Sequence, residues 1–118
     1  MPQIRIEYSA NVASSFDARG FAGRVHEIVP AMVDTDLGNC KTRLVELSHF
    51  LVGDGSSEHA MIHVDVRILS GRSQPQKEQL GKAVLAALEE SVRESHLKVQ
   101  MTVEVRELDR DNYHKRLI

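Results

Sequence analysis

The chain of 118 residues has no tryptophan, only two tyrosines and three phenylalanines, and a single cysteine, Cys40. One cysteine excludes an internal disulfide. With so few aromatic rings, the core must be filled by Val, Ile, Leu, Met and Ala, each of which contributes modestly when buried. Such a core is thin for an isolated monomer, and the composition therefore mildly favours stabilisation by subunit association.

Neither sign of charge dominates, because 15 Lys and Arg residues oppose 17 Asp and Glu residues and leave a formal net charge of -2. The basic residues form no stripe that could neutralise a phosphate backbone, so nucleic acid is not expected as a partner. The N-terminus alternates like a strand where a signal peptide needs an apolar helix. We expect a protein of the cytoplasm with no membrane partner.

The first half of the chain has a strand, a helix and a second strand. Apolar and polar residues alternate from Gln3 to Tyr8, which predicts a strand. Apolar residues then recur at helical spacing from Phe16 to about residue 33, and a turn-rich segment, residues 34–39, follows. A second strand is predicted from Thr42 to Val52, before a Gly- and Ser-rich loop at residues 53–57.

The second half repeats this plan. Residues 60–68 alternate and predict a strand, and Ser73 is a plausible N-cap of a helix running to about Ser95. Gln76 stands three residues after Ser73, the spacing of a capping box. A last strand is predicted over residues 99–105, and the tail, residues 109–118, shows no periodicity.

This order predicts one α/β domain over residues 1–118, made of pseudo-repeats 1–55 and 56–108 and the tail. Two β-α-β units with crossover connections share one mixed four-stranded sheet with both helices on one face. The other sheet face is polar and is either solvated or a subunit interface. A ferredoxin-like module that binds a small effector has the same element order, but its sheet is antiparallel throughout.

Pro2 is the sharpest chemical signal. A small residue after Met1 favours removal of that methionine, which leaves a secondary amine at the start of a strand. Burial or nearby cations lower the pKa of an amine and keep more of it neutral and able to accept a proton. If Met1 stays attached, Pro2 is an amide and cannot act as a base.

Three basic residues could hold carboxylates. Arg72 lies in a Gly-Arg-Ser turn between a strand and a helix, where backbone N–H groups and a guanidinium can bind one together. Lys41 and Arg43 open the second predicted strand on one face and could bind a second. Taken singly, each is more simply a surface residue.

Histidine and cysteine give weaker signals. His59 and His63 share a strand face with Asp65, an array that could bind a metal, yet no third ligand of the usual spacing accompanies them. Cys40 precedes Lys41 but has no histidine partner placed by the sequence, so a structural thiol is favoured. We predict no metal and no cofactor.

Four segments together resemble the 5-carboxymethyl-2-hydroxymuconate isomerases of the tautomerase superfamily, which also includes relatives of 4-oxalocrotonate tautomerase and of macrophage migration inhibitory factor. The segments are MPQIRIEYS, CKTR, MIHVDVRILSGRS and MTVEVREL, and the similarity spans nearly the whole chain. It implies a tautomerase-like duplicated fold, a homotrimer and an isomerase with Pro2 as its catalytic base.

The resemblance also assigns the binding residues. It places a carboxylate-binding arginine at Arg72 and a second arginine of the family at Lys41, where lysine keeps the charge but loses the bidentate fork. Arg43 matches a further basic position, and Phe50 an aromatic that walls the site or simply packs. The implied reaction is a 1,3-hydrogen shift from a dienol to a conjugated ketone on an unsaturated hydroxy di- or tricarboxylate, in homoprotocatechuate breakdown. A family member with lost or altered activity remains a third possibility, because of Lys41.

Overall fold

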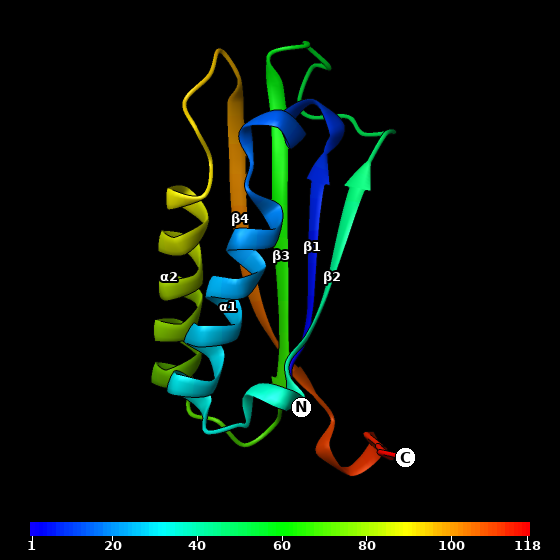
Figure 1. Cartoon of the computed structure of the whole chain (residues 1–118), viewed down its shortest axis with the longest axis vertical. Helices are drawn as coiled ribbons and strands as arrows, with labels where there is room; N and C mark the ends of the chain where they lie inside the picture. The colour runs from blue at the N-terminus through cyan, green and yellow to red at the C-terminus, as the bar shows by residue number, and fades with distance from the viewer.

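Two helices pack on one face of a four-stranded sheet in the computed structural model, which describes residues 1–118 (Figure 1). The strands lie in the order β2-β1-β3-β4, so the first strand is central. Their bounds, in chain order with the helices, are β1 Gln3–Ser9, α1 Ala18–Val33, β2 Lys41–Leu47, β3 His59–Leu69, α2 Gln74–Glu90 and β4 Lys98–Leu108.

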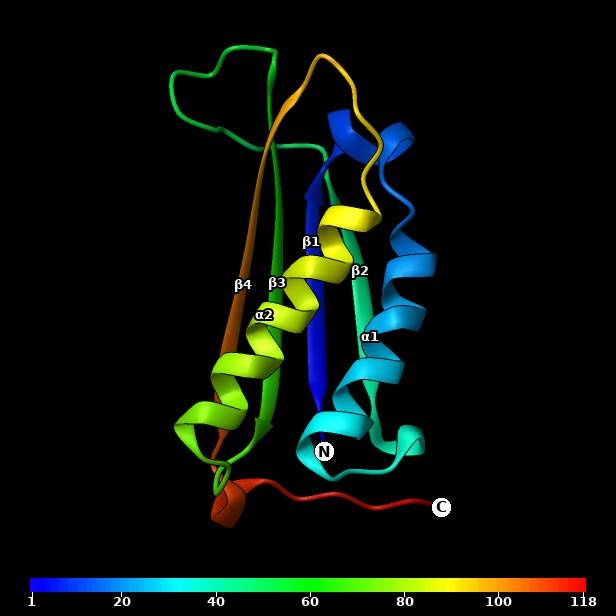
Figure 2. The same cartoon turned by 90° about the vertical axis from the view of Figure 1, so that its left-hand side faces the viewer.

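The sheet consists of two parallel pairs placed side by side. β1 is parallel to β2, β3 is parallel to β4, and the central contact between β1 and β3 is antiparallel. This arrangement confirms the predicted mixed sheet and differs from the wholly antiparallel sheet of a ferredoxin-like module. Figure 2 shows both helices lying across the same face of the sheet.

The core lies between this face and the helices. β3 contributes the residues that alternate inward from Ala60 to Ile68, all of which are buried, as predicted from their period of two. Helix α1 buries Phe21, Val25 and Val29, and α2 buries Leu80 and Leu88 against the same layer. Neither helix combines the length and the apolar character that a membrane-crossing helix requires.

Two predicted boundaries were wrong. The second strand ends at Leu47 instead of Val52, because its partner β1 ends at Ser9, which is paired with Leu47. The second helix ends at Glu90 instead of about Ser95. There the Ser91 hydroxyl donates a 2.8 Å hydrogen bond to the Ala87 carbonyl, and the Arg93 N–H donates to Ser15, so the chain leaves the helix to meet the segment before α1.

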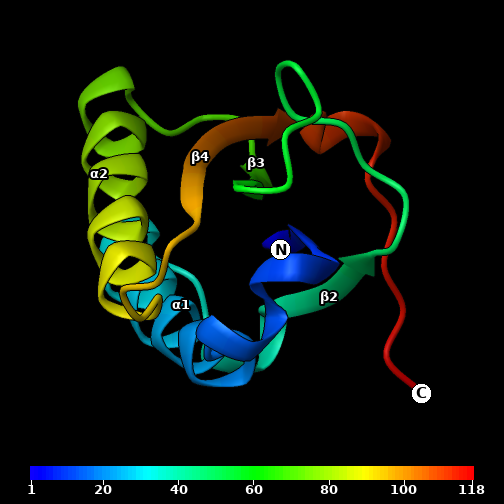
Figure 3. The ribbon, with the colours of Figure 1, turned by 90° about the horizontal axis from the view of Figure 1, so that it is seen from above.

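The tail also has structure that its sequence did not predict. A short 3-10 turn covers Arg110–Asn112, and the remaining residues run extended on the side of the sheet away from the helices (Figure 3). The Gln3 side-chain amide donates a 2.7 Å hydrogen bond to the Tyr113 hydroxyl, and Lys115 Nζ donates one of 2.8 Å to Asn39 Oδ1. The tail therefore passes close to the N-terminal end of the chain.

Candidate functional site

Pro2 lies buried at the entrance to the central strand. Its carbonyl accepts a 3.2 Å hydrogen bond from the Lys41 backbone N–H, and the next residue, Gln3, is paired in register with Lys41. The start of the chain is thus fixed between the start of β2 and the end of β3, since β3 runs antiparallel to β1. In the chain with Met1 attached, the Pro2 nitrogen is an amide.

Arg72 reaches the same end of the sheet from the turn between β3 and α2. Gly71 has a φ of 114°, a conformation that residues with a Cβ rarely adopt, and it turns the chain so that Arg72 points back toward α1. The guanidinium donates hydrogen bonds from Nε and Nη2 to the Val33 carbonyl, at 3.2 and 2.7 Å, and from Nη1 to the Leu69 carbonyl, at 3.1 Å. Two of its five N–H donors remain free.

A cavity of about 400 Å³ opens where these segments meet. Its lining combines the chain start, the two guanidinium groups of Arg72 and Arg110, and polar residues of the α1–β2 connection. The lining residues are Met1, Asp34, Thr35, Asp36, Asn39, Leu69, Arg72 and Arg110.

The environment of the cavity favours a neutral amine. The pKa of the Met1 amino group is lowered from its ordinary value of 8.0, chiefly by burial and then by the positive charges of Arg72, Lys41 and Arg110. The pKa of the nearby Cys40 thiol is raised, because burial disfavours the thiolate more than the cations favour it. A base is therefore favoured at the chain start, whereas a nucleophilic thiolate is not.

The other predicted binding residues lie at different distances from this cavity. Lys41 Nζ donates a 3.2 Å hydrogen bond to the Asn39 carbonyl, at the cavity's edge. Arg43 donates to Gln3 Oε1 and, with Arg5 and Arg67, lines a separate hollow of about 320 Å³. Within one chain, Lys41 lies at the edge of the cavity that Arg72 lines, whereas Arg43 lies at a different hollow.

Phe50 lies toward the opposite end of the molecule. Because β1 and β2 run parallel from the pair Gln3 and Lys41 to the pair Ser9 and Leu47, Phe50 follows the far end of the sheet. Six strand residues at roughly 3.3 Å each separate the two ends by about 20 Å. If Phe50 walls a site that contains Pro2, that Pro2 must belong to another copy of the chain.

Arg110 also lines this cavity, and the sequence analysis did not single it out. Its Nε and Nη2 donate hydrogen bonds of 3.0 and 2.9 Å to the Ser70 carbonyl, which holds the guanidinium at the cavity. The tail has no periodicity, and the only cue was a turn-forming Asp109 that accepts a hydrogen bond from the Asp111 N–H. That cue predicts a turn, but it does not predict the contact with Ser70.

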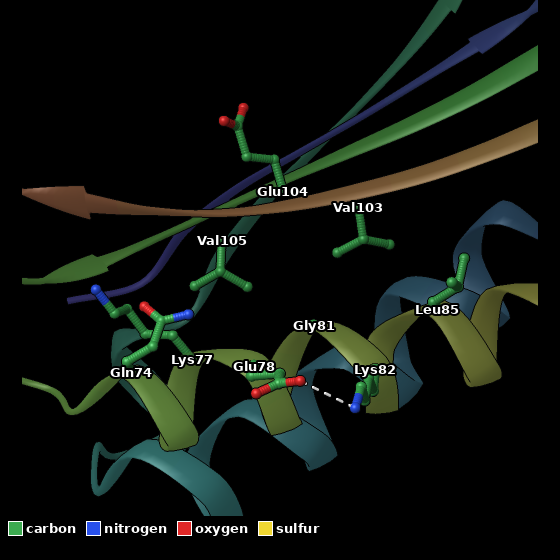
Figure 4. Close-up of a pocket in the computed structure, with 9 residues that line it drawn as sticks. All are labelled: Gln74, Lys77, Glu78, Gly81, Lys82, Leu85, Val103, Glu104 and Val105. Carbon is green, nitrogen blue, oxygen red and sulfur yellow. Dashed lines mark ion pairs between the residues drawn. The ribbon is translucent and has the colours of Figure 1, made fainter.

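Another hollow, of about 440 Å³, lies between α2 and β4 (Figure 4). Val103 and Val105 point toward the helix there, while Glu104 points to the other side of the strand. Lys82 is already paired with Glu78 at 3.1 Å, and no histidine or arginine lines the hollow. It lacks the convergent polar groups that mark a binding site, despite its size.

A possible metal cluster lies on the open sheet face. His63, Asp65 and Glu104 place potential ligand atoms within 4.8 Å of one another. However, Asp65 Oδ2 already accepts hydrogen bonds from Arg67 and Arg106, at 3.2 and 3.3 Å, and these positive charges oppose a cation. His59, which the sequence grouped with His63, instead lies 3.4 Å from Asp54.

Solved structures place this fold in a known class. A 5-carboxymethyl-2-hydroxymuconate isomerase from Deinococcus radiodurans R1 matches with a TM-score of 0.84 at 22% identity, covering 98% of this chain and 88% of that one. A protein described as a Q0 fused 4-OT wild-type symmetric trimer matches with a TM-score of 0.72 at 17% identity, covering 94% and 89% of the two chains. The fold is that of the tautomerase superfamily, as predicted.

The sequence comparisons narrow this class to one family. The family model for 5-carboxymethyl-2-hydroxymuconate isomerase matches residues 2–117. The 5-carboxymethyl-2-hydroxymuconate Delta-isomerase of Escherichia coli is 24% identical over 111 residues, which cover 92% of this chain and 87% of the relative. The chain therefore belongs to the 5-carboxymethyl-2-hydroxymuconate isomerase family, and it is an isomerase.

Proposed function

We propose that the chain, once Met1 is removed, catalyses a cofactor-independent tautomerisation of a dienol to its conjugated ketone, with Pro2 as the base. The substrate is 5-carboxymethyl-2-hydroxymuconate or a similar unsaturated hydroxy di- or tricarboxylate. The observation that carries the proposal is the position of Pro2, buried at the chain start close to Arg72 and Lys41, whose positive charges lower the pKa of the Met1 amino group beside it. A neutral amine among cations suits an anionic substrate that must lose a proton.

The chemistry needs only proton transfer and charge stabilisation. Neutral Pro2 takes the proton from the 2-hydroxyl group, which produces a dienolate, and then returns a proton to the carbon at the far end of the conjugated system. The amine is thereby regenerated, and the product is a conjugated ketone. Arg72 and Lys41 hold carboxylates and stabilise the dienolate charge as it develops.

Arg72 is prepared for this role by its backbone contacts. Three of its donors are bonded to the carbonyls of Val33 and Leu69, which fix the guanidinium before substrate arrives. Lys41 offers a point charge on a flexible stem without a planar fork, so it constrains a carboxylate less. This difference favours a substrate whose second carboxylate needs less exact placement, in line with the possibility of altered specificity.

Assembly into a homotrimer is part of the proposal. The sheet face opposite the helices carries no second layer, and the fused 4-OT neighbour is described as a symmetric trimer. An assembly of three copies also supplies a way for Phe50 to approach the Pro2 of a neighbouring chain. The proposed reaction belongs to homoprotocatechuate breakdown, in the cytoplasm.

The test is a continuous assay of ketonisation of 2-hydroxymuconate-type dienols, with the N-terminus of each preparation established by intact mass. We expect Pro2→Ala and Arg72→Ala each to lower kcat/KM, and the loss of the positioned secondary amine to cost about 10²-fold. An Arg116→Gln variant serves as the control, because Arg116 is exposed and lies outside the cavity. An unchanged rate for Pro2→Ala in processed protein contradicts the mechanism.

A further inference from the structure

Arg110 combines firm attachment with unused binding capacity. Its Nε and Nη2 each donate one hydrogen bond to the Ser70 carbonyl, and its backbone N–H lies 3.4 Å from Ser70 Oγ. A guanidinium has five N–H donors, so three are left over. Its Nη2 lies over the Gly71 turn, where a Cβ would be in ordinary van der Waals contact with it at 3.7 Å.

No carboxylate neutralises the two guanidinium groups of the cavity. The ion pairs of the structure include neither Arg72 nor Arg110. By contrast, three arginines on the open face of the sheet each have an acidic partner, namely Arg5, Arg67 and Arg106. Asp34 and Asp36 belong to the cavity lining, but both are exposed and pair with neither arginine. Fixed, unpaired guanidinium groups at one cavity are suited to binding an anion with two charged ends.

The two arginines reach the cavity from different elements. Arg72 comes from the turn before α2 and is held by Val33 and Leu69, whereas Arg110 comes from the tail and is held by Ser70. Their backbone anchors, Leu69 and Ser70, are adjacent in the chain. Because the anchors differ, each guanidinium keeps its own position and its own free donors, and the two can bind separate groups of one ligand.

We propose that Arg110 forms a second carboxylate subsite, so that the cavity binds dicarboxylates with Arg72 and Arg110 holding one carboxylate each. The inference rests on the proposed function and adds to it a specificity-determining residue from the C-terminal tail. Lys41, at the cavity's edge, offers a point charge without a planar fork, and Arg110 of the tail supplies such a fork at the same cavity.

The test compares two ligands that differ only at one end. trans,trans-Muconate is a six-carbon diene with a carboxylate at each end, and sorbate is the trans,trans six-carbon diene with a carboxylate at one end and a methyl group at the other. Their affinities are measured by titration calorimetry on the full chain with Met1 removed. The variants are Arg110→Gln, Arg110→Lys, Arg72→Gln and the control Arg116→Gln.

We expect Arg110→Gln to weaken muconate binding about tenfold and to change sorbate binding less than about twofold. Arg110→Lys should recover part of the muconate affinity, because lysine keeps the charge but not the fork. Arg72→Gln should weaken both ligands. Equal losses for muconate and sorbate, or no loss for muconate, would overturn the proposal.

Two further measurements keep the result unambiguous. Thermal unfolding followed by far-UV circular dichroism shows whether Arg110→Gln disturbs the fold, and the sorbate affinity of the same sample shows whether the cavity is intact. Ligand binding does not depend on proton transfer by Pro2. If the wild-type protein prefers muconate through Arg110 but does not convert dienols, the subsite is supported and only the proposed reaction is contradicted.

Discussion

Arg72 has two separate functions in this cavity. It closes the C-terminal end of α1 by donating to the Val33 carbonyl, and it adds positive charge beside the chain start. A purely structural cap would need only the first function. The effect on the N-terminal amine separates them, because the pKa of that amine responds to the charge of Arg72 and not to its hydrogen bonds.

This effect predicts a pH dependence. A base works when neutral, so kcat/KM should rise with pH through the pKa of the amine and level off above it. Burial and the charges of Arg72, Lys41 and Arg110 lower the pKa of the Met1 amino group, and we expect the same surroundings to lower the pKa of the Pro2 amine, which extends activity toward lower pH. We expect Arg72→Gln to raise the pKa and move the rising limb to higher pH, as measured by the pH profile of kcat/KM.

The decisive quantity is the pH at which kcat/KM rises, and not the constant value that kcat/KM reaches at high pH. Loss of a carboxylate contact lowers the plateau without moving the limb. Arg116→Gln, which removes a positive charge from the exposed end of the tail, should leave the limb in place. A limb that stays fixed in Arg72→Gln would show that the charge of Arg72 does not tune the base.

Residue types alone were enough to propose part of this candidate site. Pro2 and Arg72 could be proposed because one follows Met1 and the other lies in a Gly-Arg-Ser turn, both of which are local signals. Arg110 could not be proposed in this way. Its position depends on a carbonyl 40 residues earlier in the chain, and no local pattern encodes that contact.

For helices and strands, the sequence patterns predicted the middle of each element better than its ends. The alternation in β3 and the helical spacing in α1 identified both elements, because each buries one face against the same core. The ends of β2 and α2 depend on other segments. Apolar residues continue past Leu47 and past Glu90, but β1 offers no partner beyond Ser9, and Phe16 forms a bridge with Val92.

The N-terminus of α2 is the exception, since its cap is entirely local. Ser73 Oγ accepts a 3.3 Å hydrogen bond from the Gln76 N–H, and Gln76 Oε1 accepts one of 3.1 Å from the Ser73 N–H. We expect Ser73→Ala to lower the free energy of unfolding by about 1 kcal/mol. The measurement is urea denaturation, in which the midpoint falls while the m-value stays constant.

Ser57→Ala is the matched control for this prediction, because Ser57 is exposed in a loop and makes no hydrogen bond through its side chain. Its midpoint should equal that of the unmodified chain. If Ser73→Ala and Ser57→Ala denature alike, the capping box contributes nothing measurable to stability.

The whole molecule exposes more surface than its size requires. Its accessible surface is 7253 Å², whereas a monomer of 13.2 kDa is expected to expose about 6,400 Å². Its radius of gyration is 15.0 Å against about 13.5 Å for a compact domain of this length. Only 21 of the 118 residues are buried, which agrees with the thin core inferred from composition.

These dimensions lead to a prediction about assembly. Light scattering coupled to size-exclusion chromatography should give a mass of about 40 kDa, three times the 13.2 kDa of one chain. The reason is that the open sheet face and the exposed tail are covered when copies associate. A mass near that of one chain over the full range of working concentrations would contradict the trimer.

Sequence periodicity could not decide whether water or another subunit covers the sheet face opposite the helices. Its side chains alternate outward whether the next layer is water or another subunit, and both environments accept a mixture of charges. Asp65 illustrates the difficulty. It is buried on this face although its sequence position marks it as outward, and its Oδ1 atom has no hydrogen-bond partner within the chain.

The contact between Arg72 and Val33 links the two halves of the chain in one further way. The Val33 carbonyl is one of the last four of α1, which have no N–H partner within the helix, and a guanidinium from the second half of the chain supplies the donor. An anion in the cavity offsets the charge that faces the negative end of the helix dipole. Fraying of the last turn of α1 is then linked to ligand occupancy, and the backbone amides of this turn become an internal reporter of whether the cavity is filled.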